Sequence, residues 1–149
     1  MVKKILLPVD GSKTSLKAAA FATDLARQLG ASIIAISVID KRLFMGGATV
    51  PPQSDKEITQ SVEGYLKGVA DNYLEDVSKL CKKNKVPFKA LIKMGYPAVE
   101  IVREARRAGA HMIVMGSRGR SALSATVLGS VSYGVIHHDK NVPVLIVRD

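Results

Sequence analysis

His111-Met112-Ile113-Val114-Met115-Gly116-Ser117-Arg118-Gly119 joins a short apolar run to a turn that contains two glycines. The apolar part, residues 111–115, has the length and composition of a buried strand. Gly129 and Ser130 follow at the spacing Gly-x2-Gly-x9-Gly-Ser, where the pattern predicts that a helix begins. A strand that passes through such a loop into a helix can bind phosphate, because glycines allow close backbone approach and the helix N-terminus presents free N–H groups. The stretch therefore predicts an α/β fold and favours nucleotide binding.

The glycines also have a simpler interpretation, as the flexible residues of an ordinary strand–loop–helix connection without a ligand. The clear strand before the loop and the clear helix after it favour a ligand. The chain contains neither G-x-x-x-x-G-K-[ST] nor G-x-G-x-x-G. These absences exclude a Walker A loop and the usual dinucleotide fingerprint, so the prediction depends on the glycine spacing and its context.

Apolar runs and helical patterns alternate along the rest of the chain. The runs predict strands over 3–9, 32–39, 88–94 and 142–147, besides the one at 111–115. Apolar residues from Leu16 to Leu29 recur at helical spacing, and further helices are predicted over 55–84, 98–108 and 129–138. Gly64 and Gly68 weaken the long helix, so the pattern leaves a break there open. Residues 41–53 are predicted to form a flexible surface loop.

The alternation of five strands with four helices indicates a parallel sheet with helices on both faces. Right-handed crossovers make such a sheet doubly wound, and its ligands bind at the C-terminal strand edge where the strand order reverses. The loop at Asp10 and the loop from Gly116 to Ser130 both follow strands at this edge. If the first and fourth strands are neighbours, the two loops face one crevice, although these patterns alone leave the strand order open.

Composition limits the class of protein. The 149 residues predict one domain, residues 1–149, without an apolar run long enough for a membrane span. The first residues superficially resemble a signal peptide, but Pro8 and Asp10 interrupt the apolar run, which favours a first strand. The single cysteine, Cys81, cannot form an internal disulfide, which indicates a cytoplasmic protein.

The net charge of +9 invites a nucleic-acid interpretation, but the basic residues are dispersed. Aromatic residues make up only 5% of the chain and there is no Trp, so the side chains on which bases stack are scarce. A solvated basic surface is therefore favoured over nucleic-acid binding, which depends on charge alone.

Five segments of this chain occur together in one known family. They are Ile5-Leu6-Leu7-Pro8-Val9-Asp10-Gly11-Ser12, Gly95-Tyr96-Pro97, the segment from Ile113 to Gly119, Gly129-Ser130-Val131 and the segment from Val142 to Val147. In this order and spacing, over essentially the whole chain, the sequence resembles the universal stress protein family. Within that family Gly-x2-Gly-x9-Gly-[Ser/Thr] marks the ATP-binding subgroup, and the spacing is intact in this chain.

The resemblance implies a Rossmann-like, five-stranded parallel sheet in the order 3-2-1-4-5, with ATP across the first and fourth strands. It also implies a homodimer through the last strand, from Val142 to Val147. Tyr96 departs from the family pattern, in which many members carry His at this turn. Matched by position, the nucleotide-binding residues would be Pro8 and Asp10 at the adenosine end, the Val38 backbone at the adenine, Met115 and Gly116 along the ribose and phosphate approach, and Gly119, Gly129, Ser130 and Val131 at the phosphates.

The residues themselves leave two roles open. Asp10 can accept hydrogen bonds from ribose hydroxyls or hold a divalent cation through water, or it can cap the following helix; we favour ligand contact. Arg118 can neutralise phosphate charge or point to solvent, and the sequence does not decide between them. His137-His138-Asp139 predicts no metal site, because adjacent histidines on a helix diverge and no second cluster completes the ligands.

No nucleophile–base pair is visible around Ser12, Ser117 or Ser130, so we expect no catalytic residues and at most slow hydrolysis. The leading hypothesis is an ATP-binding regulatory protein of the stress response. In it ATP, with or without Mg²⁺ or Mn²⁺, acts as a switch ligand for an unidentified protein partner. A slow Mg-dependent ATPase or nucleotide-processing enzyme is the alternative, and a nucleic-acid-binding protein is the third hypothesis.

Overall fold

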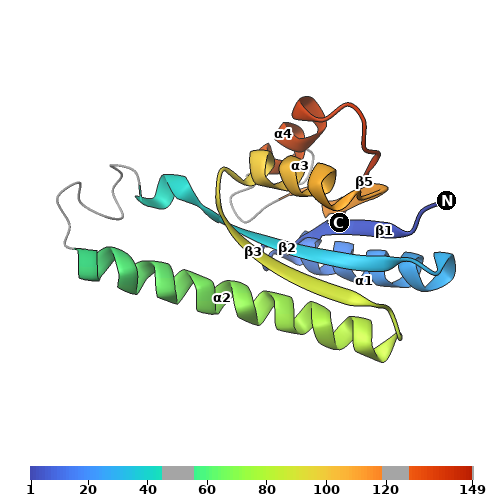
Figure 1. Cartoon of the computed structure of the whole chain (residues 1–149), viewed down its shortest axis with the longest axis horizontal. Coiled ribbons are helices and arrows are strands. Elements are labelled where there is room, and N and C mark those ends of the chain that lie inside the picture. Colours follow the sequence, from blue (N-terminus) through green and yellow to red (C-terminus); the bar gives the residue numbers. More distant parts are fainter. Residues whose placement is uncertain (45–55, 119–127, 149) are drawn as a thin grey trace.

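The computed structural model describes residues 1–44, 56–118 and 128–148. All five strands pair in parallel in the order β3-β2-β1-β4-β5 (Figure 1), which confirms the predicted α/β fold and the strand order that the family resemblance implied. The strands are β1 (Lys4–Pro8), β2 (Ser32–Asp40), β3 (Phe88–Gly95), β4 (Met112–Gly116) and β5 (Val144–Val147). The helices are α1 (Lys13–Leu29), α2 (Lys56–Lys83), α3 (Pro97–Ala108) and α4 (Ser130–His138), with a short 3-10 helix, η1 (Lys41–Phe44).

The helices cover both faces of the sheet. In Figure 1, α1 and α2 lie on one side of the strands, and α3 and α4 lie on the other. The core against α1 and α2 contains Ile5 and Leu7, whereas the core against α3 and α4 contains Leu6 and Ile113. Successive residues of β1 therefore bury opposite faces of the sheet, which explains why this strand is apolar without alternation.

Helix α1 packs on the sheet mainly through small residues, and of its three leucines only Leu25 packs against the core. Leu16 and Leu29, which fit the predicted helical spacing, are 49% and 45% exposed. Small side chains let the helix backbone approach the sheet closely, and this close approach determines the geometry at the start of α1. The buried face of α1 consists of Thr14, Ser15, Ala18, Ala19, Ala22, Thr23 and Ala26.

The long helix α2 and the segment before it differ from what the sequence pattern predicts. Helix α2 is continuous from Lys56 to Lys83, without the break that Gly64 and Gly68 left open. Leu74, Val77 and Cys81 anchor it in the core, and this packing outweighs the roughly 1 kcal/mol that each glycine costs relative to Ala. Of the loop predicted at 41–53, the first four residues form η1, and residues 45–53 lie outside the described residues. No helix in the described part is long and apolar enough to cross a membrane.

Candidate functional site

A cleft of about 550 Å³, open to solvent, lies at the C-terminal ends of β1 and β4. These strands are the neighbours at which the strand order reverses, with β2 and β3 on one side and β5 on the other. Loops that leave such strands pass to opposite faces of the sheet and open a crevice between them. Seven residues that the sequence singled out line this cleft: Pro8, Asp10, Val38, Met115, Gly116, Arg118 and Val131.

Three predicted site residues are not among the lining residues. Gly129 is buried at the N-cap of α4, and its N–H donates a hydrogen bond to the Ser117 carbonyl at 2.6 Å. Ser130 is the first residue of α4, and its side chain is exposed. Gly119 lies outside the described residues. Of the segment predicted to bind the phosphates, the structure therefore describes residues 116–118 and the residues from 128 onwards.

Further lining residues were not predicted from the sequence. Ile36 and Ile101 are typical core residues, and no local signal separates them from other apolar positions. Pro97 and Ser132 do carry a signal, because each lies in the first turn of a helix that follows the C-terminal edge of the sheet. The complete set of unpredicted lining residues is Val9, Ser15, Ile36, Pro97, Ile101 and Ser132.

The turn between β1 and α1 is held by its own polar groups. The Asp10 carboxylate accepts a hydrogen bond from the Ser12 N–H at 2.9 Å, and the Asp10 N–H donates to Ser15 Oγ at 3.1 Å. Ser12 is the N-cap of α1, and its Oγ accepts from the Ser15 N–H at 3.2 Å. Asp10 thus stabilises the turn without being the cap. Its second carboxylate oxygen has no hydrogen-bond partner among the described residues.

The backbone that follows β4 is fixed by hydrogen bonds to three successive carbonyl groups. Ser132 Oγ, from α4, donates to the Gly116 carbonyl at 2.7 Å, and the Gly129 N–H donates to the Ser117 carbonyl. Thr14 Oγ1, from α1, donates to the Arg118 carbonyl. Residues 116–118 are therefore tied to helices on both faces of the sheet.

Gly116 is required by packing, whatever its role toward a ligand. A Cβ added at this residue would lie 2.6 Å from Thr14 Oγ1 and 2.8 Å from the Thr14 carbonyl carbon. A backbone atom cannot swing aside as the end of a flexible side chain can, so a larger residue would displace α1 or the end of β4. A substitution of Gly116 would therefore disturb the fold as well as any ligand site.

The cleft combines an apolar part with a polar part. Ile36, Val38, Ile101 and Met115 belong to the core between the sheet and α3 and present aliphatic surface that fits a flat, apolar-faced group. Arg118 and the first turns of α1 and α4 form the polar part. The N–H groups of a first helical turn lack partners within the helix, and the helix dipole adds positive potential, so this part favours an anion.

A second hollow, of about 870 Å³, lies at the opposite, N-terminal end of the strands. Glu104, which lines it, is 2% exposed and accepts two hydrogen bonds from Arg107. These hydrogen bonds lower the pKa of the Glu104 carboxyl below its ordinary value. Lys4 Nζ donates to the Ala108 carbonyl at 3.1 Å, at the end of α3. The charged groups of this hollow are thus largely engaged within the protein.

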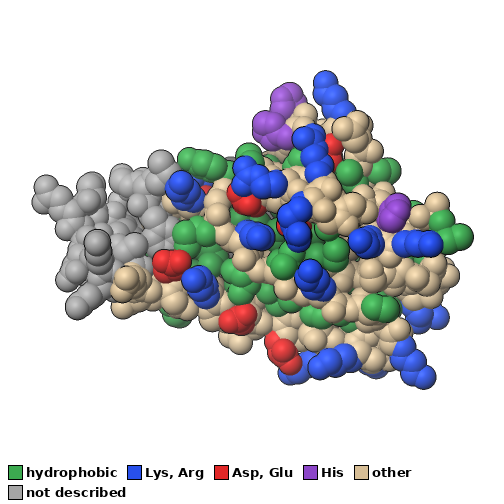
Figure 2. Space-filling model, viewed as in Figure 1, with side chains coloured by type: hydrophobic (Ala, Val, Ile, Leu, Met, Phe, Trp, Pro, Cys, Tyr) green, Lys and Arg blue, Asp and Glu red, His purple; other side chains and the backbone are tan. Residues whose placement is uncertain are grey.

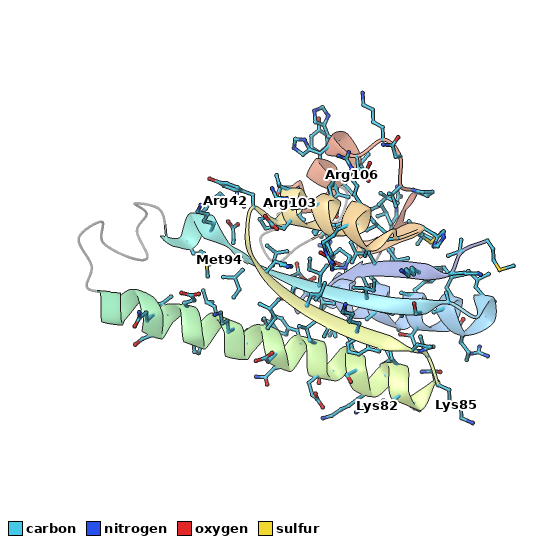
Figure 3. All side chains as sticks on the ribbon, in the orientation of Figure 1. Arg42, Lys82, Lys85, Met94, Arg103 and Arg106 are labelled. Atoms are coloured by element: carbon cyan, nitrogen blue, oxygen red, sulfur yellow. The ribbon has the colours of Figure 1, made fainter. Side chains whose placement is uncertain are left out.

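Basic side chains are spread over the face that carries β3 and α3, with apolar and acidic side chains between them (Figure 2). Arg106 extends from α3 (Figure 3), and its guanidinium lies 3.5 Å from the Asp139 carboxylate that follows α4. Arg103, on the same helix, pairs with Glu100 at 2.6 Å. Several of the basic side chains on α3 therefore form ion pairs within the chain.

The sequence matches the model of the Universal stress protein family over residues 1–148. The chain belongs to the universal stress protein family. Among its relatives, universal stress protein MJ0531 of Methanocaldococcus jannaschii is 35% identical over 148 residues, which cover 99% of this chain and 83% of the relative. Universal stress protein MJ0577 of the same organism is 32% identical over 157 residues, which cover 99% of this chain and 96% of the relative. The family resemblance seen in the sequence is confirmed.

Solved structures of this family share the fold. The MJ0577 structure has a TM-score of 0.86 at 32% identity and covers 100% of this chain and 97% of that chain. A universal stress protein in complex with cAMP has a TM-score of 0.68 at 22% identity, and covers 99% of this chain and 97% of that chain. The universal stress protein from Archaeoglobus fulgidus in complex with dAMP has a TM-score of 0.63 at 21% identity. It covers 99% of this chain and 98% of that chain. Members of the family thus form complexes with adenine nucleotides.

Proposed function

We propose that this chain binds ATP in the cleft at the C-terminal ends of β1 and β4, and that the bound nucleotide acts as a switch ligand in the stress response. The main support is the meeting of an aliphatic pocket with two helix N-termini at one crevice. An adenine nucleotide has two matching parts, a flat base and an anionic phosphate group. Family members in complex with cAMP and dAMP add support from related proteins.

In this proposal the base, the ribose and the phosphates of the nucleotide each contact residues of matching chemistry. The adenine packs against Val38 and Met115, with the backbone at Val38 able to hydrogen-bond the edge of the base. Asp10 accepts hydrogen bonds from the ribose hydroxyls through the oxygen that Ser12 does not engage. The phosphates lie near Arg118 and the first turn of α4, which begins at Ser130.

The first turn of α4 contributes backbone groups as well as side chains. The first hydrogen bond of this helix runs from the Tyr133 N–H to the Gly129 carbonyl, so the N–H groups of the three residues before Tyr133 have no partner within the helix. The Gly129 N–H, in contrast, already donates to Ser117. We therefore assign the phosphate contacts of this turn to Ser130 and Val131, rather than to the N–H of Gly129.

A divalent cation would reach this site with the nucleotide. The described residues contain no group of three or more His, Cys, Asp or Glu that could hold a metal ion. Phosphate oxygens and water would then supply most ligands of Mg²⁺ or Mn²⁺, and Asp10 would be its nearest protein carboxylate. ATP affinity should consequently change little when the metal is omitted, because the base and the ribose make their contacts without it.

A homodimer through β5 forms part of this proposal. The four residues of β5 are half-buried, none is charged, and the strand lies at one edge of the sheet. The other edge strand, β3, carries Lys89 and Lys93, and charges of this kind discourage strand pairing. Sedimentation equilibrium should give twice the mass of the chain. A monomer mass at micromolar concentration would contradict the dimer and leave nucleotide binding untouched.

Mass spectrometry of released ligand and titration calorimetry test nucleotide binding directly. Protein purified rapidly should release an adenine nucleotide, and the emptied protein should bind ATP with a micromolar Kd. GTP is the matched control, because it carries the same phosphates on a different base, and it should bind more weakly. If no nucleotide is released and neither ligand gives heat, the cleft is not a nucleotide site.

The rate of ATP hydrolysis distinguishes a switch ligand from the substrate of a slow enzyme. A switch ligand should remain intact on the purified protein for longer than it takes to exchange with free ATP. Turnover that persists through rigorous purification and disappears in Asp10→Ala would instead identify a slow Mg-dependent ATPase. Both measurements use the same nucleotide-loaded protein, so one preparation decides between them.

A further inference from the structure

Two buried hydroxyl groups hold the backbone that follows β4, one from each layer of helices. Thr14, on α1, is 3% exposed and its Oγ1 donates to the Arg118 carbonyl. Ser132, on α4, is also 3% exposed and its Oγ donates to the Gly116 carbonyl at 2.7 Å. The carbonyl between them, that of Ser117, accepts from the Gly129 N–H. Three successive carbonyl oxygens are therefore engaged by donors of the protein.

We propose that Thr14 and Ser132 are positioning residues for nucleotide phosphates, an inference that rests on the proposed function of the cleft. Neither hydroxyl needs to touch the ligand. Thr14 holds the carbonyl oxygen of Arg118 in a fixed direction, and with it the backbone orientation of Arg118. Ser132 holds the carbonyl oxygen of Gly116, in a peptide whose Ser117 N–H also donates to the Val147 carbonyl at 2.9 Å.

The physical reason is electrostatic. A carbonyl oxygen carries partial negative charge, so a peptide that is free to rotate can present this oxygen to a phosphate and repel it. A carbonyl that already accepts a hydrogen bond from a buried hydroxyl costs free energy to turn, because the turn leaves a buried polar group without a partner. The two hydroxyls thus preorganise the backbone next to the phosphates before the ligand arrives.

The sequence of the chain allows a matched pair of variants at Thr14. Thr14→Val replaces the hydroxyl by a methyl group and keeps the shape of the side chain, whereas Thr14→Ser keeps the hydroxyl and removes the methyl group. Ser132→Ala removes the second hydroxyl with little change in volume. It also provides an independent variant if Thr14→Val does not fold, since Thr14 packs against the backbone of Gly116.

Titration calorimetry with two ligands provides the test, because adenosine carries the base and ribose of ATP but no phosphate. Thr14→Val and Ser132→Ala should each weaken ATP binding about tenfold and change the Kd for adenosine by less than about twofold. Thr14→Ser should bind both ligands as the wild type does. Melting temperatures measured without ligand show how far each variant is destabilised.

Two results would overturn the inference while leaving the proposed function in place. ATP affinity equal to that of the wild type in both hydroxyl-deleted variants would show that the carbonyl orientation does not matter. An equal loss of affinity for ATP and for adenosine would show that the hydroxyls only support the fold. Absence of ATP binding by the wild-type protein is a different result, since it would overturn the proposed function itself.

Discussion

The cleft at the C-terminal ends of the strands and the hollow at their N-terminal ends are built on the same sheet. The N-terminal hollow is the larger, at about 870 Å³ against about 550 Å³, and it is lined by four charged side chains. In that hollow Arg107 hydrogen-bonds Glu104, and Lys4 hydrogen-bonds the end of α3. In the cleft the polar side chains fix backbone turns, and the Asp10 carboxylate keeps one oxygen without a partner among the described residues.

Neither the volume of a hollow nor its number of charged side chains therefore identifies the end at which we propose that the nucleotide binds. At the N-terminal end, Glu104 and Arg107 pair with each other and Lys4 donates to a backbone carbonyl, so most of the charged groups already have a partner within the protein. At the C-terminal end, the reversal of strand order sends two loops to opposite faces, and the polar groups lie at the starts of α1 and α4. Ser12 caps the Ser15 N–H of α1, whereas the N–H groups of residues 130–132 have no partner within α4. The two ends are distinguished by whether their polar groups already have partners, rather than by how many polar groups they have.

Filling each hollow with a large side chain should give the largest contrast. Val38→Trp places an indole in the apolar part of the cleft and should weaken ATP binding by roughly 100-fold or more, because the base loses its space. Val38 is half-buried, so the fold should tolerate the change. Lys89→Trp in the N-terminal hollow is the control and should leave the Kd unchanged. Calorimetry measures both, and ATP binding to Val38→Trp with wild-type affinity would place the base elsewhere.

Removal of the buried charge at the N-terminal end should affect stability and not affinity. Glu104→Gln weakens charge-assisted hydrogen bonds to Arg107 and should lower the free energy of unfolding by about 1.5 kcal/mol. Urea denaturation at pH 7 measures this change. The Kd for ATP should stay the same, and a large loss of affinity would mean that the two ends are coupled.

The Glu104 carboxyl group also makes the stability of the fold depend on pH, in a direction that its lowered pKa determines. Hydrogen bonds from Arg107 lower the pKa of Glu104 below its ordinary value of 4.5, so the folded state binds the proton less tightly than the unfolded state. The stabilisation is complete above that ordinary value and is lost as the pH falls through the lower pKa of the folded protein. The difference in stability between the wild type and Glu104→Gln should therefore shrink below pH 4.5, as measured by denaturation across that range.

Single arginines at the two ends should show a smaller contrast. Arg118→Ala removes a cation from the polar part of the cleft and should weaken ATP binding about fivefold, with little change for adenosine. Arg107→Ala removes a cation from the N-terminal hollow and should change neither Kd. If Arg107→Ala weakens ATP binding as much as Arg118→Ala does, net charge rather than position attracts the nucleotide.

The smallest effect is expected at Lys4. Its Nζ donates to the Ala108 carbonyl near the protein surface, and an exposed interaction of this kind contributes less than about 0.5 kcal/mol. Lys4→Gln should unfold within about 0.5 kcal/mol of the wild type and bind ATP with the same Kd. A marked loss of stability would show that the N-terminal hollow depends on more than the Glu104 pair.

The positions of the strands and helices and the α/β class follow from the sequence. The apolar runs at 3–9 and 111–115 correspond to β1 and β4 with each end displaced by one residue, because fully buried parallel strands must be apolar on both faces. It also placed Asp10 and Gly116 at the correct edge of the sheet, since this edge follows from where each strand ends. The assignment of the family came from motifs distributed over the whole chain.

Which residues line the cleft depends on contacts between segments that are distant in the sequence. Ile36 and Ile101 line the cleft through long-range packing, and no local pattern sets them apart from other apolar residues. The sequence pattern explains Gly116 by the approach of a phosphate, but its contact with Thr14 across the sheet edge already requires a glycine. Local propensity follows from neighbours in the chain, whereas a carbonyl that accepts from a distant hydroxyl, as Arg118 does from Thr14, exists only after the helices have packed.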